Sequence, residues 1–307
     1  MSRHLRIGTR ASPLAIWQAE HVRDALLRHH PGITVEIVSM TTRGDTWLED
    51  APPHTWGGKG LFVKEIEDAL LQGQVDLAVH SMKDVPAQQP DGLEIAAIMA
   101  REDVRDAFVS KAYPHPDALP EGARVGSSSL RRRAQLLRYH PHLRVEDLRG
   151  NVATRLRKLD EGQYDAVILA AAGLKRLGLQ DRITHLLDID HSLPAVGQGA
   201  IGIETRSDDT VMRGRLVPLA DADTQSCVLA ERSMNQVLGG DCRLPVAAVA
   251  EWRGTRIHLR GLVATPDGRR ILRAEAEGRD PAALGRTVAE ALVAQGAAQI
   301  IQDIRCS

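Results

Sequence analysis

The chain has 307 residues and a formal net charge of -1, with 43% apolar and 26% charged residues. This composition is ordinary for a globular protein of two or three domains, and it excludes a disordered, collagenous or coiled-coil chain. No apolar stretch is long enough to span a membrane, and the N-terminus lacks the apolar core of a signal peptide. The cysteines are too few and too scattered for a disulfide framework or a zinc site. We therefore expect a cytoplasmic, metal-independent protein with reduced thiols.

Arginine is concentrated in one part of the chain. Residues 124–158 hold nine Arg and one Lys against only Glu146 and Asp147, although the whole protein is nearly neutral. The planar guanidinium binds carboxylate or phosphate through two parallel hydrogen bonds. This segment is therefore either a solvated surface face or the lining of a cleft for a polyanion.

The first hundred residues alternate predicted strands and helices. Strands are expected at 5–9, 34–40, 75–80 and 93–99. Ser12 followed by Pro13 is typical of a helix start, and this helix is expected to run to about residue 30. A second helix is indicated by the apolar spacing after Phe62 and ends at Gly73. The alternation predicts a parallel-sheet α/β architecture.

A second, similar pass begins near residue 105. Strands are expected at 107–110 and 124–128, helices at 129–139 and 151–161, and a buried strand running into a loop at 164–174. In each pass an Asp opens a buried strand and a basic residue follows, Asp76 with Lys83 and Asp165 with Lys175. The sequence thus predicts two α/β lobes facing a cleft.

The chain changes character after the second pass. Residues 192–204 have the Gly and Pro content of a hinge. Beyond residue 220 we expect a helix at 224–238, strands at 246–252, 256–265 and 269–278, and a last helix at 281–296. This order predicts a small α+β domain with an antiparallel sheet. Residues 45–60 have no periodicity, which is typical of a lid or a disordered loop.

Three segments carry candidate chemistry. In 125–133 a strand leads through serines into a helix whose first turn holds Arg131, Arg132 and Arg133. Helix N-termini attract anions, and arginines there require a compensating anion; the alternative is a simple cap with solvated arginines. Arg10 and Ser12 repeat the arrangement in the first pass.

The other two segments contain an acid and a thiol. Lys83 and Asp84 follow a buried strand at the end where α/β sheets bind ligands, and the alternative is a surface ion pair. Cys242 lies in a Gly-rich turn beside Arg243, which makes it a candidate nucleophile, with a buried inert cysteine as the alternative.

Together these segments resemble the porphobilinogen deaminase (hydroxymethylbilane synthase) family over essentially the whole chain. The matching motifs are 10–19, 41–45, 57–67, 76–86, 101–110, 125–136, 148–156, 170–179, 193–204 and the Cys242 loop. The resemblance implies a transferase of porphyrin and heme biosynthesis that joins four porphobilinogen molecules into the linear tetrapyrrole hydroxymethylbilane and releases ammonia. It also implies a dipyrromethane cofactor, built from the substrate and thioether-linked to Cys242, and no metal.

The resemblance also assigns residues and domains. Asp84 is the implied catalytic residue. The implied carboxylate-binding residues are Arg10, Ser12, Lys59, Lys83, Arg101, Ser128, Ser129, Arg131, Arg132, Arg149, Arg155, Arg176 and Gln198. The implied fold has two lobes like periplasmic binding proteins, 1–99 completed by 200–217 and 105–193, and a cofactor-carrying α+β domain at 222–307. A monomer without nucleic-acid or membrane partners is expected.

This chemistry accounts for the arginines. Each pyrrole ring carries an acetate and a propionate, so a growing chain brings many carboxylates into one cleft. Loss of ammonia leaves an electron-poor azafulvene, and a fixed carboxylate such as Asp84 stabilises positive charge as it develops at the pyrrole nitrogen. Thr55 and Asp241 depart from the family pattern, the first at a position where a Lys is often found and the second beside the cofactor cysteine.

Two other functions fit parts of the sequence. A two-lobed periplasmic solute-binding protein would share the lobes and an anionic ligand, but it leaves the last domain and Cys242 unexplained. A nucleic-acid binder would use the arginine cluster, but the pI of about 6.9 and the 3% aromatic content argue against it.

Overall fold

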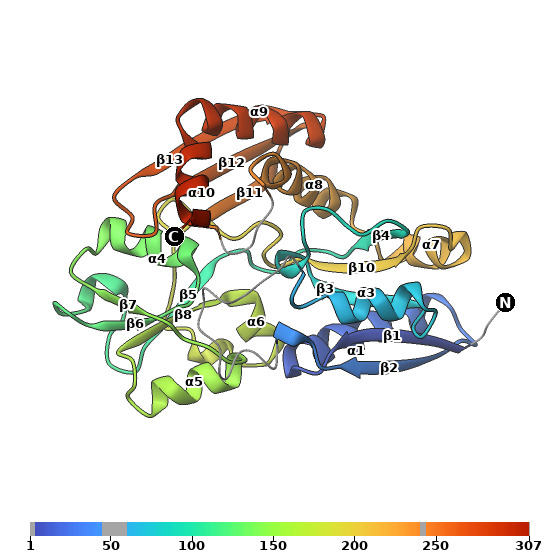
Figure 1. The fold of residues 1–307 in the computed structure, drawn as a ribbon. Helices are drawn as coiled ribbons and strands as arrows, with labels where there is room; N and C mark the ends of the chain where they lie inside the picture. The colour runs from blue at the N-terminus through green and yellow to red at the C-terminus, as the bar shows by residue number, and fades with distance from the viewer. Residues whose placement is uncertain (1–3, 45–59, 240–243, 307) are drawn as a thin grey trace. The chain divides into compact units, whose positions relative to one another are not determined.

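The computed structural model describes residues 4–44, 60–239 and 244–306. The chain divides into two compact units, Met1–Arg101 with Ala200–Gln225, and Glu102–Gly199 with Ser226–Ser307 (Figure 1). It leaves the first unit after Arg101 and returns to it at Ala200. The division into three domains stays a prediction.

The first unit is built on a five-stranded mixed sheet. In spatial order its strands are β2 (Thr34–Met40), β1 (His4–Arg10), β3 (Leu77–Ser81), β10 (Ile201–Arg206) and β4 (Leu93–Ile98). β2, β1 and β3 are parallel, whereas β10 runs antiparallel to both β3 and β4. The four strands predicted in the first hundred residues therefore run in the same direction, as predicted. The antiparallel strand β10 was not predicted, because its first residues were expected to belong to a hinge.

Helices cover both faces of this sheet. α1 (Pro13–His29) packs Val22 and Leu26 against Ile7 on one face. α3 (Lys64–Leu71) packs Ile66 against Ala78 on the other. Ser12 caps α1 as predicted. The remaining elements of this unit are η2 (Met82–Asp84), α7 (Thr210–Leu216), η5 (Val217–Leu219) and the start of α8 (Ala222–Val237).

The second unit repeats this sheet. Its spatial order is β7 (Arg144–Glu146), β6 (Arg124–Gly126), β8 (Ala166–Ala170), β5 (Asp106–Val109) and β9 (His185–Leu186). Three strands are again parallel and are followed by an antiparallel one, β5. Its helices are η3 (Pro116–Ala118), α4 (Leu130–Tyr139), α5 (Val152–Asp160), α6 (Ala171–Arg176) and η4 (Gln180–Arg182). The predicted repeat of two α/β lobes is thus confirmed, although α6 replaces an expected loop.

The repeat extends to individual hydrogen bonds. The Asp76 carboxylate accepts a hydrogen bond from the backbone N–H of Arg6 at 2.8 Å, and the Asp165 carboxylate accepts one from that of Arg124 at 2.7 Å. Each Asp thus joins the strand it opens to a neighbouring parallel strand, β1 in the first unit and β6 in the second. The predicted Asp-strand pattern therefore reflects a shared structural role.

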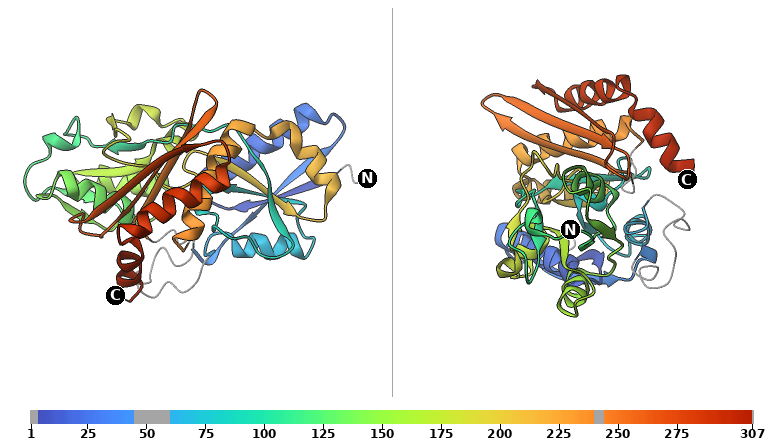
Figure 2. Two further views of the ribbon diagram at one scale, coloured as in Figure 1. Left: turned by 90° about the horizontal axis from the view of Figure 1, so that it is seen from above. Right: turned by 90° about the vertical axis from the view of Figure 1, so that its left-hand side faces the viewer.

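An antiparallel sheet completes the second unit, as predicted. It consists of β11 (Val246–Arg253), β12 (Arg256–Ala264) and β13 (Ile271–Gly278), and its helices are α8, α9 (Pro281–Ala294) and α10 (Ala297–Cys306). The three helices share one apolar cluster with this sheet, and Figure 2 shows α9 lying along it. The sheet's other face packs against Ala134 of α4 and against Leu193.

Candidate functional site

In the first unit two turns bring candidate residues together at one edge of the sheet. β1 and β3 are parallel, so Arg10, which ends β1, and Asp84, in η2 after β3, lie at the same edge. The Arg10 Nη1 atom lies 3.9 Å from Asp84 Oδ2, and its guanidinium lies 4.3 Å from the Phe62 ring centroid. The nearby guanidinium favours one orientation of the Asp84 carboxylate. The Asp84 side chain is 32% exposed, so this carboxylate remains accessible.

The described part of this unit holds three further candidates, Ser12, Lys83 and Arg101. Ser12 accepts a hydrogen bond from the backbone N–H of Ala15 at 3.4 Å and so serves as the cap of α1. Lys83 precedes Asp84 in η2 and is half-buried. Arg101 donates its backbone N–H to Thr224 Oγ1 at 3.2 Å.

In the second unit the candidates gather where β6 turns into α4. Ser129 caps α4, accepting a hydrogen bond from the backbone N–H of Arg132 at 3.4 Å. Ser128 donates to the Leu148 carbonyl at 2.9 Å and accepts from the Leu148 N–H at 3.0 Å. Arg131 and Arg132 are only 4% and 8% exposed, so the alternative of solvated arginines is wrong for this pair.

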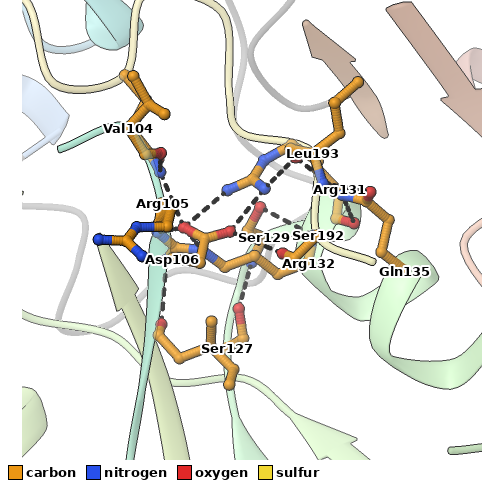
Figure 3. Close-up of polar contacts among 12 residues, drawn as sticks. Val104, Arg105, Asp106, Ser127, Ser129, Arg131, Arg132, Gln135, Ser192 and Leu193 are labelled. Atoms are coloured by element: carbon orange, nitrogen blue, oxygen red, sulfur yellow. Dashed lines mark hydrogen bonds and ion pairs between the residues drawn. The ribbon is translucent and has the colours of Figure 1, made fainter. Parts of the chain in front are cut away.

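The partner that explains this burial is Asp106, the first residue of β5 (Figure 3). Asp106 Oδ2 accepts from Arg131 Nη1 at 2.7 Å, and Oδ1 accepts from Arg132 Nη2 at 2.7 Å and Nε at 3.0 Å. The two arginines also donate to backbone carbonyls, Arg131 to Leu193 at 2.7 Å and Arg132 to Ile168 at 3.0 Å. The chain itself therefore supplies one compensating carboxylate for the two arginines.

Asp106 was absent from the candidates suggested by sequence. Its motif, 101–110, was recognised, and Asp106 opens a buried strand as Asp76 and Asp165 do. Nothing local links it to α4, because its contacts with Arg131 and Arg132 join residues 25 and 26 positions apart. The signal available from the sequence was an acid that opens an apolar strand.

The electrostatics of this cluster are those of a buried ion network. Burial alone would raise the pKa of Asp106, but Arg131 and Arg132 outweigh it and hold that pKa well below its usual range. Burial also lowers the pKa of Arg131, with Asp106 acting in the opposite sense. Asp106 is therefore ionised at neutral pH and cannot act there as a general acid.

The three other candidate arginines of the second unit lie next to backbone carbonyls or an acid. Arg155 Nε donates to the Gly150 carbonyl at 2.7 Å, and Arg149 Nη2 lies 3.6 Å from Asp147 Oδ2. Arg176 Nη2 donates to the Gly199 carbonyl at 2.7 Å. Burial lowers the pKa of Arg176 to about 10, with Glu102 opposing, so it remains a desolvated cation at neutral pH.

Two expected site residues, Lys59 and Cys242, lie outside the described residues, as do Thr55 and Asp241. Among the described residues no group of His, Cys, Asp and Glu is placed to hold a metal ion, and no helix is long and apolar enough to cross a membrane.

Comparison with known proteins decides the family. The model of the porphobilinogen deaminase dipyrromethane cofactor binding domain matches residues 5–214, and that of the porphobilinogen deaminase C-terminal domain matches residues 225–294. The chain belongs to the porphobilinogen deaminase family. It is accordingly a transferase of porphyrin biosynthesis, and the expected dipyrromethane cofactor is confirmed at the level of this family.

Curated relatives cover the chain from end to end. It is 80% identical over 305 residues to porphobilinogen deaminase from Acidithiobacillus ferrooxidans, covering 99% of each chain. It is 56% identical over 302 residues to porphobilinogen deaminase from Thiobacillus denitrificans, covering 98% of each. Among solved structures, the methionine binding protein MetQ matches at 17% identity with a TM-score of 0.47, covering 76% of this chain and 94% of that one. The solute-binding alternative is not favoured, because the family models and these full-length relatives account for both parts of the chain.

The described residues fit a cofactor that carries carboxylates. Arg131 and Arg132 each donate three of their five N–H groups to described partners. Two N–H groups of each side chain are not used by these partners. Arg149, Arg155 and Arg176 add three further cations in the same unit. Such a donor set suits acetate and propionate groups better than a neutral ligand.

Proposed function

We propose that this chain condenses four porphobilinogen molecules head to tail on a dipyrromethane primer thioether-linked to Cys242, releasing ammonia at each step. Water then adds as the tetrapyrrole leaves the primer, which gives hydroxymethylbilane. The observation that carries the proposal is the 80% identity to a porphobilinogen deaminase over 99% of both chains. The cofactor, when bound, supplies the end to which the first substrate ring is joined.

Asp84 is the proposed catalytic residue. As ammonia leaves, positive charge develops on the substrate ring and is shared by its pyrrole nitrogen. A carboxylate held near that N–H stabilises the charge without reorganisation. The pairing of Asp84 with Arg10 at 3.9 Å and its partial exposure support this role, because the carboxylate is oriented without being enclosed.

The cationic and polar candidates bind carboxylates in this proposal. Each charge-assisted hydrogen bond contributes about 1.5–3 kcal/mol net. The described members of this set are Arg10, Ser12, Lys83, Arg101, Ser128, Ser129, Arg131, Arg132, Arg149, Arg155 and Arg176. Gln198 belongs to the set by resemblance, and its side-chain amide donates to the Val104 carbonyl at 2.7 Å and to Asp106 Oδ1 at 3.0 Å. Ser12 and Ser129 cap helices, so their contribution includes orienting the N–H groups of the first turns of α1 and α4. Lys59 completes the set by resemblance alone.

The cellular form is part of the proposal. We infer a cytoplasmic monomer with lobes at 1–99 with 200–217 and 105–193, a cofactor domain at 222–307, and no nucleic-acid or membrane partner. The near-zero net charge and the low aromatic content support the lack of a nucleic-acid partner. Light scattering coupled to gel filtration measures the mass of the particle and tests the monomer.

Intact-mass spectrometry tests the central claim. Purified wild-type protein should carry a covalent dipyrromethane, and Cys242→Ser should lack it because a thiolate is the better nucleophile. Cys227→Ser and Cys306→Ser are matched controls, since Cys227 is buried and Cys306 is exposed near the C-terminus, and both should retain the adduct. An adduct on purified Cys242→Ser protein would refute the attachment site.

A further inference from the structure

The Asp106 carboxylate joins two segments of the second unit. From α4 it receives Arg131 and Arg132. From the segment that leads back to the first unit it receives Ser192 Oγ at 3.2 Å on Oδ2 and Gln198 Nε2 at 3.0 Å on Oδ1. Counting the longer contact from Arg131 Nη2 at 3.3 Å, Asp106 accepts six hydrogen bonds and is completely buried. Its oxygens are saturated by the protein.

Burying two neighbouring guanidiniums beside one carboxylate costs free energy. Two guanidiniums side by side repel each other, and both have lost most of their hydration. A single carboxylate compensates only one of the two positive charges. The trio of Asp106, Arg131 and Arg132 therefore keeps one net positive charge in a buried place, where an anionic group is favourable.

The carboxylate also fixes the direction of the remaining donors. Arg131 is held at Nη1 and Nη2, and Arg132 at Nε, Nη1 and Nη2, by Asp106 and by the carbonyls of Leu193 and Ile168. A planar guanidinium held at two or more nitrogen atoms cannot rotate without breaking a bond. The N–H groups left by these partners are thus oriented before any ligand arrives, which lowers the entropy lost on binding.

We propose that Asp106 is a positioning residue for cofactor assembly, holding Arg131 and Arg132 so that their remaining N–H groups receive carboxylates of the dipyrromethane. The proposal rests on the proposed function, in which these arginines bind the cofactor. Asp106 itself touches neither cofactor nor substrate, because all its acceptor capacity is used within the chain.

The test measures how fast the cofactor is acquired by the full-length chain. Protein is purified from a host that cannot make porphobilinogen and is then mixed with porphobilinogen. The fraction of chains carrying the covalent dipyrromethane is followed over time by intact mass, at saturating substrate. Circular dichroism and the thermal midpoint establish that each variant is folded.

Asp106→Glu and Asp106→Asn separate position from charge. The first keeps the charge but moves the carboxylate outward by one methylene, and the second keeps the shape but removes the charge. Misplacing a binding group by about 1 Å can cost about 10²-fold in rate. We expect adduct formation to slow by at least ~10-fold in Asp106→Glu and ~10²-fold in Asp106→Asn.

Asp103→Asn is the matched control. Asp103 lies three residues away and accepts hydrogen bonds from Arg105 Nη2 at 2.8 Å and Lys175 Nζ at 2.9 Å, and these partners hold its pKa below its usual range. None of its described contacts is with Arg131 or Arg132. If loss of any acid in this region slowed adduct formation, Asp103→Asn and Asp106→Asn would be slowed equally. If Asp106 acts by positioning the arginines, Asp103→Asn forms the adduct at the wild-type rate.

The outcomes are distinct. Wild-type rates in folded Asp106→Glu and Asp106→Asn overturn the inference, and so does failure of both variants to fold, which would indicate a purely structural role. If only Asp106→Asn fails to fold, the rate of adduct formation in Asp106→Glu decides whether Asp106 has a positioning role. Arg132→Leu tests the underlying function: a wild-type rate in that variant would refute cofactor binding by Arg132 itself, whatever Asp106 does.

Discussion

Glu67 provides a test of the electrostatics inside the first unit. It lies on α3, which packs on the sheet face that carries His80 and Glu204, and it is only 7% exposed. His80 Nε2 and Glu204 Oε2 are 3.0 Å apart. Burial first, and then the Glu204 carboxylate, raise the pKa of Glu67 from 4.5 to about 7, while His80 acts in the opposite sense. Asp68 and Lys64 of the same helix act on it more weakly.

The sign of the effect on stability follows from which state binds more protons. Between pH 4.5 and about 7 the folded chain retains the Glu67 proton that the unfolded chain has lost. Stability therefore falls as pH rises through this window. At about 1.4 kcal/mol per pH unit, the loss between pH 5 and pH 8 is on the order of 2–3 kcal/mol.

Glu67→Gln removes this dependence, because Gln resembles the protonated acid at every pH. Urea unfolding at pH 5 and pH 8 should show the variant gaining on wild type by on the order of 2–3 kcal/mol across the interval. Glu20→Gln, on α1 of the same unit and 47% exposed, is the control and should show no such gain. Equal differences between Glu67→Gln and wild type at both pH values would refute the raised pKa.

The other predictions concern turnover and packing. Asp84→Asn should keep the fold and lose about 10²–10³-fold in ammonia release, the usual effect of removing one group that stabilises developing charge; near-wild-type turnover would remove Asp84 from the mechanism. Arg176→Leu should retain the cofactor and stall elongation, so that brief exposure to substrate gives a ladder of covalent intermediates by intact mass; an apo-protein would instead place Arg176 with the cofactor. Gly268→Ala should lower the free energy of unfolding by more than about 1 kcal/mol in urea titration, because Gly268 has a φ of 71° and a Cβ there would collide with the Ala134 carbonyl.

Local patterns predicted much of this fold. The cap at Ser12, the proline at the first helical position and the apolar period of α1 predict that helix nearly to the residue, because all three signals lie within the helix itself. The Pro-Asp-Gly sequence at residues 266–268, between the strands expected at 256–265 and 269–278, likewise predicts the hairpin between β12 and β13. β7 and β9 were missed because each is only two or three residues long and has no measurable period.

Contacts between distant segments could not be predicted in this way. The return strand β10 pairs with β3 and β4, which precede it by more than a hundred residues, and nothing in its own sequence indicates those partners. Asp106 was missed for the same reason. The arginines of α4 were identified as anion-binding from their place at a helix start, but the anion that holds them is fixed by the packing of β5 beside β8.

The two units use one motif for two purposes. In each, an arginine near a turn from strand to helix, β1 to α1 or β6 to α4, faces an aspartate of another element: Arg10 faces Asp84, and Arg131 faces Asp106. The first pair is loose, at 3.9 Å, and its carboxylate is 32% exposed, whereas the second is tight, at 2.7 Å, and its carboxylate is fully buried. A carboxylate that meets a substrate N–H needs an accessible oxygen, which Asp84 has and Asp106 lacks. A carboxylate that orients cations must be buried and must accept hydrogen bonds from the protein at both oxygens, as Asp106 does. Asp84 is partly exposed and is oriented by one loose ion pair. The difference in burial therefore supports the proposed division, in which Asp84 of the first unit acts in the chemistry and Asp106 of the second positions the binding arginines.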